Sequence, residues 1–141
     1  MAYTYKADLD RVKKNIACFR IDWSPFILMD RFLIHGIVPS DGGIFQVFQK
    51  INGALELIMV ERAFYGGLRN RIRELIDPLY MGYNPFKKEI QEGECYVRYA
   101  LVRLQDDMDD LMYYYTGKES TGRYKDILVD EKENLQIRKN P

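Results

Sequence analysis

The sequence predicts an α+β fold: a small three-stranded antiparallel sheet flanked by helices. Asn52-Gly53 stands between two apolar runs, and both residues tolerate the positive φ angles of a tight hairpin turn. A further apolar run at residues 95–104 predicts the third strand. Apolar residues at helical spacing precede and follow these strands, which favours helices packed against one sheet.

The bulk properties predict one domain over residues 1–141, long enough to bury a core. Its 21 basic and 21 acidic side chains cancel, so binding of a polyanion would need a local basic patch. Cys18 and Cys95 lack the spacing of a metal site, and we interpret both as reduced, buried thiols; a disulfide between them has no support. We expect a cytoplasmic protein with no membrane segment, because no signal-peptide pattern is present and every apolar run is short.

The first part of the chain predicts two helices and a hairpin. Residues 6–19 carry Leu9, Val12, Ile16 and Phe19 on one helical face, and Pro25 then breaks the pattern. Residues 27–37 predict a second, short helix. After a loop, residues 43–50 and 54–61 predict the two strands that meet at the Asn-Gly turn.

The second part predicts a helix, a strand, a helix and a tail. A Gly-Gly corner at residues 66–67 leads into a helix that ends at Asp77-Pro78. Residues 79–93 predict a long loop, and residues 95–104 a central strand that is apolar on both faces. A helix with an acidic start follows at residue 105. The charged tail, residues 130–141, is expected to have a mobile end.

Residues 22–115 resemble the GIY-YIG nuclease domain. "GIF" at residues 43–45 stands where that family has "GIY", and "MVE" at residues 59–61 stands where it has "YIG". "GLRNRI", residues 67–72, resembles the family's helix and places Arg71 at its catalytic arginine, while Arg62 falls near a frequent lysine. The order of hairpin, glycine corner, basic helix, strand and helix is also similar.

The resemblance implies a mechanism whose groups are only partly present. The family uses tyrosines to help activate a water, an arginine to face the phosphate, and a glutamate to hold a divalent metal such as Mg²⁺ or Mn²⁺. Phe45 and Met59 lack the two hydroxyls, and Glu61 replaces a glycine. Tyr65 would supply a hydroxyl beside Arg71, and Asp110 is the nearest candidate for the metal ligand. The resemblance therefore predicts weak or absent nuclease activity.

Three groups of polar side chains have alternative interpretations. Guanidinium groups suit phosphate oxygens, so a phosphate-binding face is predicted for Arg62, Arg69, Arg71 and Arg73, with Arg98 and Arg103 as possible additions. The alternative is a solvated helix face that pairs with Glu61 and Glu74. The acidic run at residues 106–110 either binds a hard cation or decorates a helix N-terminus. His35, the single histidine, is interpreted as structural.

Three functional hypotheses follow from these observations. The first is a degenerate GIY-YIG-like protein that binds nucleic acid or a phosphate-bearing ligand through the arginine-rich helix. The second is a protein-interaction module or a homo-oligomer, which the neutral net charge favours. The third is an active metal-dependent endonuclease, in which Tyr65 and an aspartate replace the lost groups.

Overall fold

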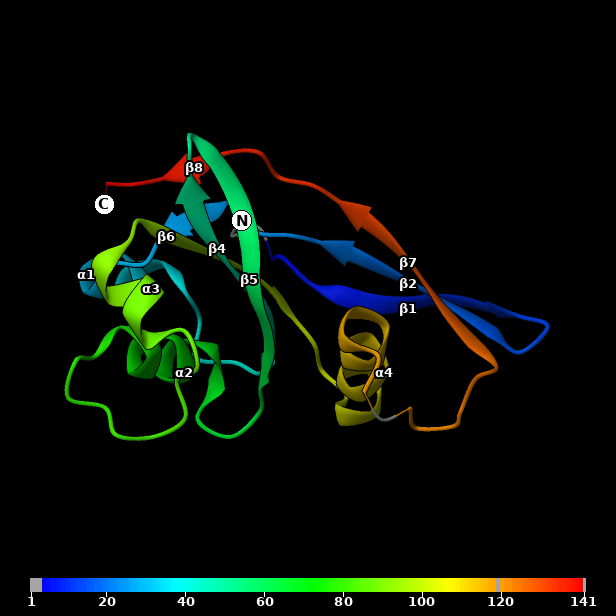
Figure 1. Cartoon of the computed structure of the whole chain (residues 1–141). Helices are drawn as coiled ribbons and strands as arrows, with labels where there is room; N and C mark the ends of the chain where they lie inside the picture. Colours follow the sequence, from blue (N-terminus) through cyan, green and yellow to red (C-terminus); the bar gives the residue numbers. More distant parts are fainter. Residues whose placement is uncertain (1–3, 119, 141) are drawn as a thin grey trace.

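The structure is a computed structural model that describes residues 4–118 and 120–140, and it contains two β-sheets and four helices over those residues (Figure 1). The larger sheet has the strand order β5-β4-β6-β3-β8, and the smaller has β1-β2-β7. The strands are β1 (Ala7–Lys13), β2 (Ile16–Asp22), β3 (Phe26–Leu28), β4 (Gly43–Ile51), β5 (Ala54–Ala63), β6 (Cys95–Leu101), β7 (Asp126–Lys132) and β8 (Ile137–Arg138). The helices are α1 (Arg31–Ile37), α2 (Gly67–Ile76), α3 (Lys87–Glu92) and α4 (Gln105–Thr116).

The predicted antiparallel sheet is present as part of a larger, mixed sheet. Strand β4 pairs antiparallel with both β5 and β6, and the hairpin turns at Asn52 and Gly53, whose φ angles are 51° and 83°. Strand β8 pairs with β3 in parallel, so the sheet is mixed. The prediction of a purely antiparallel sheet was wrong in this respect. The α+β class is confirmed, and the three predicted strands lie together at one side of the sheet.

The prediction of a helix at residues 6–19 was wrong. The segment forms a β-hairpin of β1 and β2 that turns at Lys14 and Asn15, with φ angles of 52° and 61°. Burial alternates along β2, where Ala17, Phe19 and Ile21 are fully buried. Strand β7 pairs in parallel with β2, and this distant partner stabilises the extended conformation over the helical one.

Two smaller corrections concern the other elements, and the tail adds two strands. The predicted helix at residues 27–37 begins only at Arg31, because Asp30 caps it by accepting hydrogen bonds from the backbone of Phe32 and Leu33. The predicted loop at residues 79–93 contains α3, whose Ile90 is buried in the core. The charged tail carries the end of β7 and all of β8, which pair with β2 and β3, and its mobile end stays a prediction.

Two hydrophobic clusters lie on opposite faces of the larger sheet. One face packs against α1, α2 and α3 through a cluster that includes Phe45, Ile72 and Val97. The other face meets α4 and the smaller sheet through a cluster that includes Ile44, Met108 and Phe19. Figure 1 shows α4 between the larger sheet and the strands β1, β2 and β7. No helix in the described part of the chain has the length and apolar character that a membrane span requires.

Alkaline pH should destabilise the fold through strand β6. Both cysteines are free, and burial raises the pKa of the Cys95 thiol from its ordinary value near 9 to about 11, and that of Tyr99 from 10 to about 12. The folded protein therefore keeps protons that the unfolded chain releases, so stability is complete below pH 9 and is lost as pH rises from 9 to 12. We expect a loss of about 2 kcal/mol between about pH 8 and pH 10, mostly from Cys95. Urea unfolding at both pH values measures it, and a loss that is undiminished in Cys95→Ala would contradict this assignment.

Candidate functional site

Helix α2 begins at a glycine pair that fixes its position against the preceding loop. Gly66 and Gly67 both have a φ angle of 78°, and a Cβ atom on Gly67 would lie 1.7 Å from the Ser40 carbonyl oxygen. Only glycine fits this approach. The first free backbone N–H groups of the helix donate to that loop, from Leu68 to Asp41 and from Arg69 to Pro39. These two N–H groups are therefore not available to an anion.

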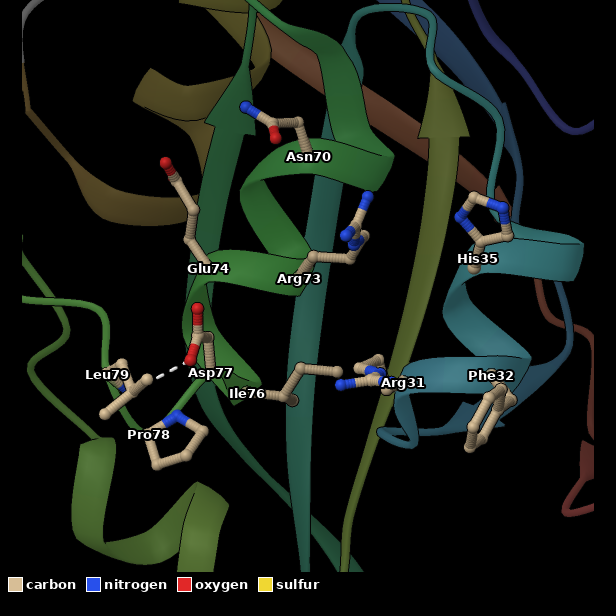
Figure 2. Close-up of a pocket in the computed structure, with 10 residues that line it drawn as sticks. All are labelled: Arg31, Phe32, His35, Asn70, Arg73, Glu74, Ile76, Asp77, Pro78 and Leu79. Carbon is tan, nitrogen blue, oxygen red and sulfur yellow. Dashed lines mark hydrogen bonds between the residues drawn. The ribbon is translucent and has the colours of Figure 1, made fainter.

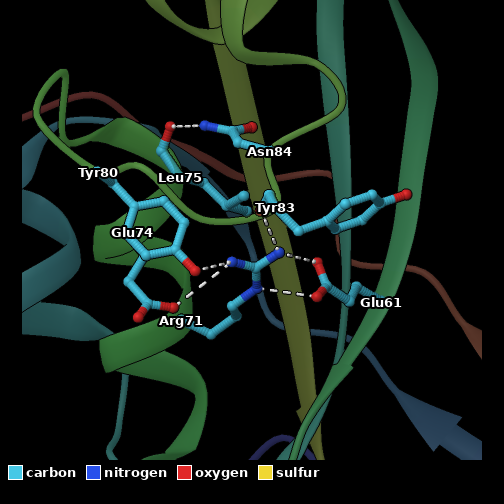
Figure 3. A network of polar contacts seen from close by, with 7 residues as sticks. All are labelled: Glu61, Arg71, Glu74, Leu75, Tyr80, Tyr83 and Asn84. Atoms are coloured by element: carbon cyan, nitrogen blue, oxygen red, sulfur yellow. Dashed lines mark hydrogen bonds and ion pairs between the residues drawn. The ribbon is translucent and has the colours of Figure 1, made fainter.

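Arg71 lies at the centre of a closed polar network (Figure 3). Its Nε and Nη2 atoms donate to the two Glu61 carboxylate oxygens at 2.8 and 3.2 Å. Its Nη1 atom donates to Glu74 and to the Tyr80 hydroxyl, both at 3.4 Å. Nη2 also donates to the Tyr83 carbonyl at 2.9 Å. A guanidinium group has five N–H donors, and these five contacts use them all.

The electrostatics of Arg71 agree with a structural role. Burial opposes its charge, but the hydrogen bonds and the negative charge of Glu61 outweigh that effect, so the pKa of Arg71 is raised above its ordinary value. Glu61, which stands at the glycine position of the GIY-YIG motif, is thus the residue that pairs with Arg71. Arg71 has no donor left for a phosphate oxygen in this conformation, which matches the ion-paired alternative rather than the predicted catalytic one.

The remaining predicted arginines do not form one face. Residues of a helix advance by about 100° each, so Arg69 and Arg73 share a side of α2 and Arg71 lies on the other. Arg69 donates from Nε to the Val38 carbonyl at 2.8 Å, and Arg62 on β5 forms an ion pair with Asp109 of α4. Arg73 is exposed on the side of α2 that faces α1.

Arg98 and Arg103, the two possible additions, differ in exposure. Arg98 is buried under the rings of Trp23, Phe26 and Phe48, and its Nε donates to Gln46 at 2.8 Å. It is therefore part of the core and not of a phosphate-binding surface. Arg103 is exposed in the segment between β6 and α4.

Tyr65, the proposed substitute for a lost hydroxyl, lies close to the predicted arginines. It is 91% exposed, and its ring meets Phe64 edge-to-face at 5.0 Å. Tyr65, Arg62 and Arg71 line one shallow cavity of about 350 Å³. Phe45 and Met59, at the two tyrosine positions of the resembled motif, are buried in the core instead.

Asp110, the candidate metal ligand, is engaged by other side chains. It is 1% exposed, and its oxygens accept hydrogen bonds from Thr121 at 2.6 Å and from the Arg123 Nε at 3.0 Å. Arg123 also bonds Asp107 at 2.9 Å. The described residues contain no group of three or more side chains arranged to hold a metal ion. A guanidinium thus occupies the place that a cation would take between these two aspartates.

The sequence did not predict the groove between α1 and α2. This cavity of about 730 Å³ is lined by Arg31, Phe32, His35, Asn70, Arg73, Glu74, Ile76, Asp77, Pro78 and Leu79. Figure 2 shows the Arg31 side chain reaching from α1 toward α2, and the Arg73 side chain reaching from α2 toward α1. The signal that could have revealed it is the i, i+4 spacing of Arg31 and His35, which places both on one side of α1.

The two arginines of the groove are available to a ligand. Neither Arg31 nor Arg73 forms an ion pair with another described residue, and the Arg31 guanidinium lies 5.3 Å from the Phe32 ring centre. The two acids at the rim have partners of their own: Glu74 pairs with Arg71, and Asp77 accepts a hydrogen bond from the Leu79 backbone. The groove therefore presents two arginines that have no ionic partner among the described residues, beside the carboxylates of Glu74 and Asp77.

Comparison with known proteins places the chain in a family without indicating an activity. A family model with the description "Uncharacterised protein" matches residues 8–141. The chain belongs to that family. Neither the curated proteins nor the solved structures give a match. The geometry of the groove and of the Arg71 network is therefore the basis for inferring a function.

Proposed function

We propose that this protein binds a phosphate-bearing ligand, with nucleic acid as the favoured class, in the groove between α1 and α2. The observation that carries the proposal is the pair of arginines, Arg31 and Arg73, that approach from opposite walls without a described ionic partner. Two guanidinium forks on facing walls suit the several oxygens of a phosphate group. The arginine-rich helix α2 remains the proposed phosphate-binding element, but the arginine that contacts the phosphate is Arg73 and not Arg71.

Neighbouring side chains add to the recognition of such a ligand. Asn70 and His35 line the same groove and offer hydrogen-bond donors beside the two arginines. Phe32 is 74% exposed at its edge, where a ring can stack on a base. This combination of cations and an exposed ring favours a nucleotide or a single strand over inorganic phosphate alone.

The GIY-YIG-like core remains part of the proposal, with little or no nuclease activity. The order β4, β5, α2, α3, β6, α4, which adds one short helix to the expected series, and the antiparallel arrangement β5-β4-β6 support that assignment. Apolar residues at both tyrosine positions and the saturated donors of Arg71 argue against catalysis. Binding in the groove needs no Mg²⁺ or Mn²⁺, and we place the protein in the cytoplasm.

Removing both groove arginines should weaken nucleic-acid binding. Labelled single- and double-stranded DNA and RNA would be titrated by fluorescence anisotropy at several salt concentrations, with and without Mg²⁺. We expect the Arg31→Gln/Arg73→Gln variant to lose about tenfold or more in affinity. The slope of log affinity against log salt should fall by about 1.4–1.8, because two phosphate contacts disappear.

A matched variant separates this site from net charge. Arg103→Gln/Arg138→Gln removes the same charge from residues that are exposed outside the groove, and it should leave affinity within about threefold. Equal losses of affinity in the two double variants would show that binding depends on the net charge of the protein and not on the groove. A wild-type protein that binds none of the four nucleic acids would remove the proposal.

A further inference from the structure

A second concavity, of about 850 Å³, lies along strand β5 and away from the α1–α2 groove. Five consecutive β5 residues line it, from Ile58 to Arg62. Successive side chains of a strand point to opposite faces, so a cavity lined by consecutive residues must run along the strand's edge. Strand β5 is the terminal strand of its sheet, and no other described strand pairs with its outer edge.

Helix α4 forms the opposite wall of this concavity, which we call the β5–α4 groove. Asp109, Met112 and Thr116 line it at i, i+3 and i+7, which is one face of a helix. The Arg62–Asp109 ion pair closes one end and shows that the two walls approach there. Two loops complete the lining, through Tyr83, Pro85 and Phe86 on one side and Lys118, Ser120 and Thr121 on the other.

The groove combines an apolar lining with unused backbone groups. Ile58, Val60, Met112 and Phe86 supply apolar surface. Every second residue of an edge strand directs its N–H and C=O away from the sheet, where they lack a strand partner. The register shifts at Ile58, so the regular edge runs from Met59 to Ala63. That edge matches about four or five residues of an extended chain.

We propose that the β5–α4 groove binds an extended peptide, which adds to the larger sheet as a strand beside β5. Backbone hydrogen bonds to β5 would supply affinity, and alternate apolar side chains would enter the lining formed by Val60 and Met112. The ammonium group of Lys118 has no ionic partner among the described residues, while Arg62 is paired, so the groove favours an acidic residue near Lys118. The partner is thus a segment with alternating apolar residues and an acidic end.

The walls of the groove favour a peptide over a second copy of this chain. Pairing of two β5 edges would bring a whole second sheet beside the strand. Helix α4 lines the concavity beside that edge, together with Tyr83, Pro85 and Phe86 and with Lys118, Ser120 and Thr121, so a second sheet would meet these groups there. A segment of a partner protein meets this constraint, because it carries no sheet behind it.

Selection from a peptide library tests the proposal directly. The immobilised full-length protein would be used to select from a phage-displayed library of random nine-residue peptides, and the enriched peptide would be synthesised. Two N-methylated versions would carry methyl groups on odd or on even residues. We expect one version to bind at least about tenfold more weakly and the other within about twofold of the parent, because only one set of amides faces β5. Amide hydrogen exchange over residues 59–63 should slow when the parent peptide binds.

Two substitutions on the exposed surface of α4 locate the binding site without disturbing the core. Thr116→Trp places a large ring in the groove and should weaken binding at least about tenfold. Tyr113→Trp places a ring of the same kind on α4 outside the groove and should leave affinity unchanged. Arg31→Gln/Arg73→Gln should also bind the peptide normally, since the two sites are separate.

Three results would overturn the assignment. One is a selection that enriches no peptide. Another is peptide affinity that stays unchanged in both N-methylated peptides or in the Thr116→Trp protein. The third is a concentration-dependent dimer that Thr116→Trp dissolves, since a second copy would then occupy the groove.

Discussion

Replacing Arg123 with methionine should lower the free energy of unfolding by about 3–5 kcal/mol, the usual cost of removing one partner from a buried ion pair. Arg123 bonds Asp107 and Asp110, which are 8% and 1% exposed. Burial opposes the charge of Arg123, but its bonds to the two aspartates outweigh that effect and raise its pKa. Without it, two carboxylates one turn apart on α4 keep their burial and lose their counter-charge. Urea unfolding near pH 7, followed by circular dichroism, measures the loss.

Variants of the two aspartates separate lost charge compensation from lost packing. Adding Asp107→Asn and Asp110→Asn to Arg123→Met should recover part of the stability, because neutral amides remove the unpaired charges. Arg103→Met, at an exposed position between β6 and α4, should change stability by less than about 0.5 kcal/mol. A loss below about 1 kcal/mol in Arg123→Met would show that solvent compensates the aspartates and that the pair is not a structural one.

The elements that the sequence predicted correctly are those with strong local signals. Asn52-Gly53 defines a hairpin without help from the rest of the chain, and the pattern of α2 between its glycine pair and Asp77 defines a helix. The β1–β2 hairpin was missed because Lys14-Asn15 is a weaker turn signal. The spacing of apolar residues there also fits a helix. What decides its conformation is β7, more than a hundred residues away, and no local pattern contains that partner.

The candidate site was harder to predict because its partners are distant in sequence. The helix that carries Arg71 was identified, but its availability depends on Glu61, Tyr80 and Tyr83, which only the fold brings around it. Asp110 was read as a metal ligand, and its actual partner Arg123 belongs to a loop beyond the helix. The α1–α2 groove joins two helices that the β4–β5 hairpin separates in the chain. The role of each of these residues depends on a contact with a residue distant in sequence, and residue type alone does not predict that contact.

Arg71→Met should destabilise the protein by about 2–4 kcal/mol and leave phosphate binding in the α1–α2 groove intact. The substitution leaves Glu61 without its bidentate partner, and it frees the loop at residues 77–86, which Arg71 holds through Tyr80 and Tyr83. Asn84 holds the same loop through the Leu75 carbonyl at 2.9 Å, so the loop loosens rather than unfolds. Urea unfolding gives the stability loss, and amide exchange over the loop gives its local component.

A double-variant cycle with Glu61→Gln decides whether Arg71 is structural or functional. If the pair is structural, Arg71→Met and Glu61→Gln should be less costly together than the sum of their separate losses, with a coupling of about 1–3 kcal/mol. Affinity for nucleic acid should then stay within about threefold of wild type in both single variants, because neither Arg71 nor Glu61 lines the α1–α2 groove. Arg71→Met could instead change stability little and abolish binding. That result would place the phosphate-binding site in the cavity that Tyr65 and Arg71 line. It would also favour a GIY-YIG-like site in which Glu61 is displaced by the ligand, since the guanidinium can release its donors only if another anion replaces that carboxylate.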